Sequence, residues 1–210
     1  MAKEGMMIND GLLAAFLDGN VSGKEVEAIL KAAAHDSSLK EFLALAALAA
    51  EAQDGLCAVH CERYILQCFG ISRPVDELVS FMLDRDLIKD GGTPLANVGC
   101  ISKHYGLSVN RIFASGMEDV EAALAAGRQV IAAVDVGELD PSKAEYESLE
   151  DRIIGPRPDH CVVVLSCDHD YDEVVCYDPS EGDIPVSIPV TAFLDAWKDS
   201  ENYMVTVGRS

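Results

Sequence analysis

The stretch HCVVVLSCDHDYDEVVCYD, residues 160–178, predicts a β-hairpin with a polar turn. Residues 161–167 are almost continuously apolar, which is typical of a strand that is covered on both faces. Residues 168–172 are mostly acidic or polar, and apolar residues resume at Val174 and Val175. We therefore expect residues 161–167 to form a central strand of a sheet and residues 173–177 to return beside it.

This hairpin brings an imidazole close to a carboxylate. If the turn is centred near His169, antiparallel pairing places His160 opposite Asp178, because both lie equally far from the centre. Directly opposed residues point to the same face, with Cβ atoms about 5 Å apart. A neighbouring carboxylate holds an imidazole in one orientation and one tautomer, as acid–base catalysis requires. A register slip of one residue would separate the two side chains.

Cys57 is the candidate nucleophile. It follows the turn signal Asp54-Gly55 and begins a predicted helix over residues 57–69 that Gly70 closes. The positive end of a helix and its free N–H groups lower a thiol pKa from about 8.5 to roughly 3.5–7.5. The same N–H groups can stabilise an oxyanion. A thiol at a helix start, a strand histidine and an acid together predict a nucleophile, a base and an orienting group.

The remaining elements place the helices before most of the strands, which is typical of an α+β fold. Helices are predicted over residues 74–83, between Pro94 and Gly106 with Thr93 as N-cap, and from the capping pair Ser115 and Glu118 to Gly127. Strands are predicted over residues 107–113, 129–134, 161–167, 173–177 and 203–207. Residues 136–159 have no clear periodicity, three prolines and many acids, and they are a candidate lid over a site.

The first quarter of the chain has a different pattern. Residues 9–52 contain only helical patterns, with capping boxes at Ser22/Glu25 and at Ser38/Glu41. We therefore expect a small helical module over residues 1–52, followed by a catalytic domain over residues 53–210.

Composition excludes several classes of function. Lys and Arg number 16 and Asp and Glu number 36, so the net charge is −20, which disfavours nucleic acid and anionic membranes as partners. The longest apolar stretch, near residues 42–50, is too short to span a membrane, and the N-terminus lacks the layout of a secretory signal. Seven cysteines without a framework spacing favour reduced thiols and a cytoplasmic location.

The other cysteines favour a structural interpretation. Cys61 and Cys68 share one helix face with Cys57, so we expect them in the core, as we do the four remaining cysteines, Cys100, Cys161, Cys167 and Cys176. A metal site at Cys57, His60 and Cys61 would need a second ligand pair with zinc-like spacing, which the sequence does not offer. We expect no metal and no organic cofactor.

From Gln53 to Val207 the chain resembles the bacteriocin-leader (double-glycine) cysteine peptidases, which form cysteine-peptidase family thirty-nine of the papain-like clan. The resemblance rests on six pieces in the same order: Cys57 with Phe69-Gly70, residues 90–94 leading to residues 103–107, residues 127–131, His160 before a Val-rich strand, Asp178-Pro179, and residues 193–197. It implies a papain-like fold with Cys57 as nucleophile, His160 as general base and Asp178 as orienting acid.

Two positions depart from the family pattern. Ala58 replaces the glycine that usually follows the nucleophile, and Glu51 stands where the family has its oxyanion-hole glutamine. Gln53 lies two residues further on and is our candidate for that role. Loss of one oxyanion donor costs an enzyme about 10²–10³ in rate.

The function predicted from these residues is a thiol-dependent hydrolase, a cysteine peptidase that cleaves a peptide or protein substrate through a Cys57 acyl-enzyme. Two alternatives remain. The domain can be a catalytically inactive binding or regulatory protein with the same fold, or an enzyme of amide transfer or deamidation that uses the same triad.

The N-terminal residues have a resemblance of their own. Residues 9–25 are similar to the opening helices of bacterial anti-sigma regulators, which suggests a protein partner for the helical module. The zinc-binding set of many such regulators is absent, because His35 is not followed by a Cys-x-x-Cys.

Overall fold

The computed structural model describes residues 55–89, 92–139, 157–182 and 184–209, together with Leu12, Ile29 and Ala32. The contacts of the chain fall into two units, Met1–Ala52 and Gln53–Ser210. Nearly all of the first unit lies outside the described residues, so the predicted helical module stays a prediction. In the part of the chain that the structure describes, no helix is long and apolar enough to cross a membrane.

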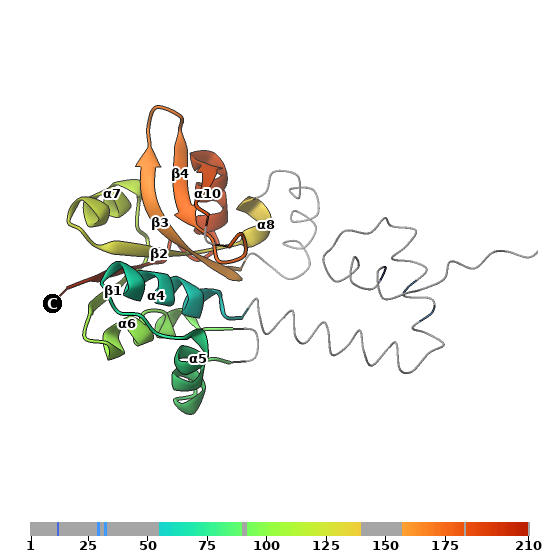
Figure 1. The fold of residues 1–210 in the computed structure, drawn as a ribbon. Coiled ribbons are helices and arrows are strands. Elements are labelled where there is room, and N and C mark those ends of the chain that lie inside the picture. Colours follow the sequence, from blue (N-terminus) through green and yellow to red (C-terminus); the bar gives the residue numbers. More distant parts are fainter. Residues whose placement is uncertain are drawn as a thin grey trace, which may run out of the picture. The chain divides into compact units, whose positions relative to one another are not determined.

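A six-stranded sheet forms the centre of the second unit (Figure 1). Its strands are β1 (Ser108–Ile112), β2 (Gln129–Val134), β3 (His160–Asp168), β4 (Glu173–Tyr177), β5 (Val186–Pro189) and β6 (Met204–Gly208). They lie in the order β1-β6-β2-β3-β4-β5, and every neighbouring pair is antiparallel. The predicted α+β class is confirmed.

Helices cover both faces of this sheet (Figure 1). One face packs against α4 (Cys57–Cys68) and α6 (Cys100–His104), and α5 (Val75–Asp84) joins the same core through contacts with these two helices. The other face packs against α7 (Met117–Ala125) and α10 (Val190–Lys198). The 3-10 helix η1 (Leu95–Asn97) and the short helix α8 (Val136–Leu139) complete the described elements.

The central strands are apolar on both faces, as the run at residues 161–167 predicts. In β3, Cys161 and Val163 pack on the α4 side, whereas Val162 and Val164 pack on the α7 and α10 side. All four are buried. Successive side chains of a strand point to opposite faces, so a continuous apolar run supplies both cores at once.

The helix predicted between Pro94 and Gly106 is wrong in one respect, because it is interrupted. Residues 95–97 form η1 and residues 100–104 form α6, with Gly99 between them at φ +90°. A Cβ atom at Gly99 would lie 2.6 Å from Cγ1 of Val109. The close approach of Gly99 to β1 therefore decides the break, and only glycine fits there.

The N-terminus of α7 also differs from prediction. The expected cap was Ser115 with Glu118, but α7 begins at Met117 and the Gly116 N–H donates to Asp119 Oδ2 at 2.8 Å. The Ser115 hydroxyl is buried and has no hydrogen-bond partner among the described residues.

Strand β5 was not predicted. It has four residues, lies at the edge of the sheet and ends at Pro189. A short strand that ends at a proline carries little of the alternating pattern by which strands are identified in a sequence.

The predicted hairpin register is also wrong, although both strands exist. Asp168 pairs with Glu173, so the turn is centred between Asp170 and Tyr171 rather than near His169. Asp168 Oδ1 accepts the N–H groups of Asp170 and Tyr171, which stabilises this position of the turn. A β-bulge between Val164 and Ser166 then shifts the pairing by one residue. His160 is thus not opposite Asp178. Its partner is Val134 of β2, and Asp178 follows the end of β4.

Glu62 joins α4 to α6. Its carboxylate is fully buried and accepts the N–H groups of Gly99 at 2.9 Å and of Ser102 at 2.6 Å. These are free N–H groups at the start of α6, where a carboxylate is favourable. Burial nevertheless raises the pKa of Glu62 from 4.5 to about 7.

We expect the replacement Glu62→Gln to change how stability depends on pH. Between pH 4.5 and about 7 the unfolded chain releases the Glu62 proton before the folded chain does, so this group lowers wild-type stability as pH rises. Urea unfolding of both proteins across this pH range measures the effect. The unfolding free energy of the wild type minus that of Glu62→Gln should fall by on the order of 2–3 kcal/mol over that window. A difference that is constant with pH would contradict the raised pKa.

Candidate active site

Cys57 lies at the start of α4, as predicted. Leu56 precedes it with non-helical backbone angles, φ −101° and ψ 2°, so the helix begins at the thiol-bearing residue. The Cys57 side chain is 9% exposed and lines a cavity. The other lining residues are Gly55, Gly92, Thr93, Leu95, Ala133, Pro158, Asp159, His160 and Cys161.

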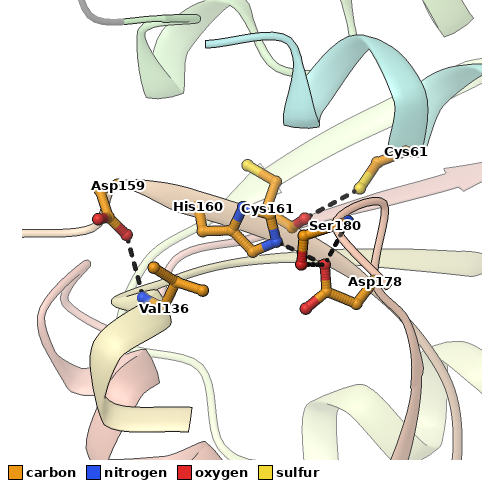
Figure 2. Close-up of polar contacts among 7 residues, drawn as sticks. All are labelled: Cys61, Val136, Asp159, His160, Cys161, Asp178 and Ser180. Carbon is orange, nitrogen blue, oxygen red and sulfur yellow. Dashed lines mark hydrogen bonds and ion pairs between the residues drawn. The ribbon is translucent and has the colours of Figure 1, made fainter. Parts of the chain in front are cut away.

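His160 and Asp178 meet despite the altered register. His160 is the first residue of β3, and its Nε2 lies 2.8 Å from Asp178 Oδ1 (Figure 2). The two residues are 9% and 5% exposed, respectively. The residue before His160 is also fixed, because Asp159 Oδ1 accepts the N–H of Val136 at 3.0 Å. The predicted interaction therefore exists, although the two residues are not paired across the strands.

Ser180 is a site residue that sequence reasoning missed. Its backbone N–H donates to Asp178 Oδ1 at 2.8 Å and its hydroxyl donates to the same oxygen at 2.7 Å (Figure 2). Together with His160, three donors converge on one carboxylate oxygen. The signal was present in the sequence, since an Asp side chain often bonds the N–H two residues on and Asp178-Pro179-Ser180 is a turn sequence.

These hydrogen bonds decide the charge of the acid and the imidazole. Burial alone would raise the pKa of Asp178, but the bonds from His160 and Ser180 lower it below its ordinary value. Burial alone would lower the pKa of His160, but the bonds to Asp178 and Cys57 and the charges of both raise it to about 10. His160 is therefore an imidazolium beside an ionised carboxylate at neutral pH.

Cys57 is the third member of this charged group. A hydrogen bond with the Cys161 side chain makes the largest contribution to its pKa, and the bond and charge of His160 add to it. These effects outweigh burial and lower the pKa of Cys57 from 9.0 to about 5. Since Nε2 of His160 is bound to Asp178, its Nδ1 is the nitrogen left for the sulfur. A thiolate–imidazolium pair results, and its thiolate is the reactive form of cysteine.

The remaining predicted residues have different outcomes. Gln53 and Glu51 lie outside the described residues, so the oxyanion-hole assignment stays a prediction. In the candidate lid, residues 136–139 form α8, and residues 140–156 lie outside the described residues. Ala58, the residue after the nucleophile, is buried. Within the described parts of the chain, no three His, Cys, Asp or Glu side chains are grouped so that they could hold a metal ion.

The cysteine predictions were only partly right. Cys61, Cys161 and Cys176 are buried, but Cys68 is exposed and was wrongly placed in the core. Cys68 is the last residue of α4. Cys100 and Cys167 are only half-buried.

Comparisons with known proteins agree with the fold described above. The model of the Peptidase C39 like family matches residues 45–205. Three solved structures share the fold at 13–15% identity. No curated protein sequence matches the chain.

The three structures are bacterial. One is the N-terminal peptidase C39 like domain of a toxin secretion ATP-binding protein from Vibrio parahaemolyticus (TM-score 0.51, 14% identity, 73% of this chain and 97% of that chain). Another is the peptidase domain of Streptococcus ComA, a bi-functional ABC transporter involved in a quorum sensing pathway (TM-score 0.52, 13% identity, 74% of this chain and 93% of that chain). The third is a Bacillus anthracis protein described as a C39-like peptidase (TM-score 0.54, 15% identity, 75% of this chain and 90% of that chain). At this identity they show the fold alone.

We expect the alkylation rate of Cys57 by iodoacetamide to rise with pH around a midpoint near 5, because its thiolate forms there. Cys68 provides an internal control, because its sulfur is partly covered although the residue is exposed, and this partial desolvation raises its pKa. Mass spectrometry of adducts across a pH series resolves both. His160→Ala should move the Cys57 midpoint upward, and a wild-type midpoint at the ordinary value for cysteine would contradict the ion pair.

We expect Ser180→Ala to raise the pKa of Asp178, because the Ser180 hydroxyl is one of the three donors that stabilise its carboxylate. NMR titration of the Asp178 carboxyl carbon measures this change. Ser180→Thr keeps the hydroxyl and should restore the wild-type value. An unchanged titration in Ser180→Ala would show that the hydroxyl does not stabilise the carboxylate.

Proposed function

The chain belongs to the Peptidase C39 like family, and from this premise we propose that it is a cysteine peptidase, which cleaves a peptide bond through a Cys57 acyl-enzyme. The observation that carries the proposal is the chain of contacts from Cys57 to His160 to Asp178. It joins a thiol at a helix start to an imidazole, and joins the imidazole to a buried acid. This is the arrangement of nucleophile, base and orienting group that acyl transfer requires.

Acylation begins from the thiolate. The Cys57 sulfur attacks the carbonyl carbon of the scissile bond, and the electron pair of the C=O bond moves to oxygen. We assign two donors to this oxyanion, the backbone N–H of Cys57, which is free at the start of α4, and the side chain of Gln53. When the intermediate collapses, the C–N bond breaks and His160 gives its proton to the leaving amine. A thioester on Cys57 remains.

Deacylation uses the same residues in reverse. Neutral His160 accepts a proton from water, and the resulting hydroxide attacks the thioester carbon. The C–S bond breaks, the carboxylic product leaves, and the thiolate and imidazolium are restored. Atoms and charge balance over the cycle, because one water is consumed for each peptide bond cleaved.

Asp178 and Ser180 hold the imidazole through both steps. The lowered pKa of Asp178 keeps its carboxylate ionised, so it stabilises the imidazolium without taking its proton. A substrate would reach the sulfur through the cavity that Cys57 and His160 line, together with Gly55 and Gly92. A Cβ atom at Gly92 would lie 3.3 Å from the Gly55 Cα, so the backbone segments are close together here.

The proposal predicts Cys57-dependent cleavage of peptides. The full-length protein incubated with a diverse peptide mixture should generate new N- and C-termini, which mass spectrometry detects. Cys57→Ala should abolish cleavage, and Asp178→Asn should lower kcat by about 10²-fold or more, because the imidazole loses its orienting charge. Cys68→Ser removes an exposed thiol outside the site and is the matched control with full activity.

Other outcomes of this experiment separate the alternatives. Conversion of side-chain amides to acids, or transfer of an acyl group to an added amine without new termini, would replace peptide hydrolysis by another acyl-transfer reaction. Rapid alkylation of Cys57 with no change in any peptide would reject the peptidase and favour a binding role for the domain.

A further inference from the structure

A second thiol lies beside the nucleophile. Cys161 follows His160 in β3, is 5% exposed and lines the same cavity as Cys57. Its side chain points from β3 toward the layer that holds α4 (Figure 2) and belongs to the same core cluster as Cys57. Two elements far apart in the sequence thus bring two free thiols into the lining of one cavity, where their side chains share a hydrogen bond.

Cys161 is better placed than Cys61 to react with Cys57. Cys61 lies one turn further along α4, and residues at this spacing have Cβ atoms about 5–6 Å apart, whereas a disulfide needs roughly 3.5–4.5 Å. The Cys61 thiol is also engaged, because it donates to the Cys161 carbonyl oxygen at 3.2 Å (Figure 2). That bond fixes the Cys161 backbone against α4. Cys161 faces α4 from another element, so no helix geometry keeps its sulfur from that of Cys57.

We propose that Cys57 and Cys161 form a reversible disulfide when hydrogen peroxide enters the cavity and oxidises Cys57. In the first step the Cys57 thiolate attacks one peroxide oxygen and the O–O bond breaks. The leaving hydroxide takes the proton of His160 and departs as water. Cys57 becomes a sulfenic acid, oxidised by two electrons, and the peroxide is reduced by two.

In the second step the Cys161 sulfur attacks the Cys57 sulfur. The S–S bond forms, the S–O bond breaks, and the hydroxide leaves as water with the proton of Cys161 carried by His160. Cys161 is a poor nucleophile before oxidation, because its hydrogen bond to Cys57 and then its burial raise its pKa. Oxidation replaces the thiolate that accepts this hydrogen bond by an uncharged sulfenic acid, so the first of these causes weakens once Cys57 is oxidised.

The disulfide has two consequences for the site. It removes the thiolate on which acyl transfer would depend, and it prevents further oxidation of Cys57 to the sulfinic acid, which cells reverse only in special cases. The inference goes beyond the proposed function and does not require it. A reactive Cys57 is sufficient, whether or not the protein hydrolyses peptides.

The test is a disulfide map of the full-length protein after treatment with hydrogen peroxide at neutral pH. Remaining thiols are blocked with N-ethylmaleimide during denaturation, and the digest is analysed without reduction. We expect a Cys57–Cys161 linked peptide and complete loss of iodoacetamide labelling at Cys57, both reversed by dithiothreitol. Linkage of Cys57 to Cys61, or no linkage while Cys57 is oxidised, would overturn the proposal.

Two matched variants sharpen the result. In Cys161→Ser, which keeps a hydrogen-bonding side chain beside Cys57 but removes the second sulfur, peroxide should convert Cys57 to the sulfinic acid, and dithiothreitol should no longer restore labelling. In Cys61→Ala, the Cys57–Cys161 link should form as in the wild type. If Cys161→Ser does not fold by circular dichroism, the linked peptide of the wild-type protein still decides the question. Because every readout is a mass or a label, failed peptide hydrolysis would leave this test intact.

Discussion

The hydrogen bond between His160 and Asp178 is the interaction on which the site depends. Both groups are buried, and isolated buried charges are strongly unfavourable. Three donors on one carboxylate oxygen, together with the Cys57 thiolate on the other side of the imidazole, compensate for the lost hydration. The carboxylate, the imidazolium and the thiolate make all of these contacts in only one arrangement. They therefore fix the start of β3, the segment after β4 and the start of α4 relative to one another.

The rest of the fold keeps these three segments in place. The two-sided core of β2 and β3 gives the sheet a helix layer on each face, and α4 lies in one of them. Glu62 then joins α4 to α6 through two backbone N–H groups, so the helix that begins with Cys57 is held by its far side as well. Arg128 joins two neighbouring strands, because its guanidinium donates to Thr206 of β6 and to Ser108 of β1.

Local sequence patterns predicted most helices and strands well, but they predicted the strand register and the contacts between distant side chains poorly. The apolar run in β3 and the start of α4 at Cys57 follow from periodicity and turn chemistry, which are local properties of the sequence. The contact between His160 and Asp178 was predicted through a wrong register, because neither the longer turn nor the bulge has a clear signal in the sequence. Ser180, Glu62 and the pairing of Cys161 with Cys57 depend on tertiary contacts, and a buried carboxylate or a core cysteine looks the same in a sequence whatever it touches.

The bulge in β3 has a consequence for the distribution of sulfur. Strict alternation would place Cys161 and Cys167, six residues apart, on the same side of the sheet. The extra residue between Val164 and Ser166 reverses the facing of the strand beyond it, and Cys167 packs with the α7 and α10 cluster. A single irregularity thus sorts the two cysteines of one strand into separate compartments, with one thiol beside the reactive sulfur and the other behind the sheet.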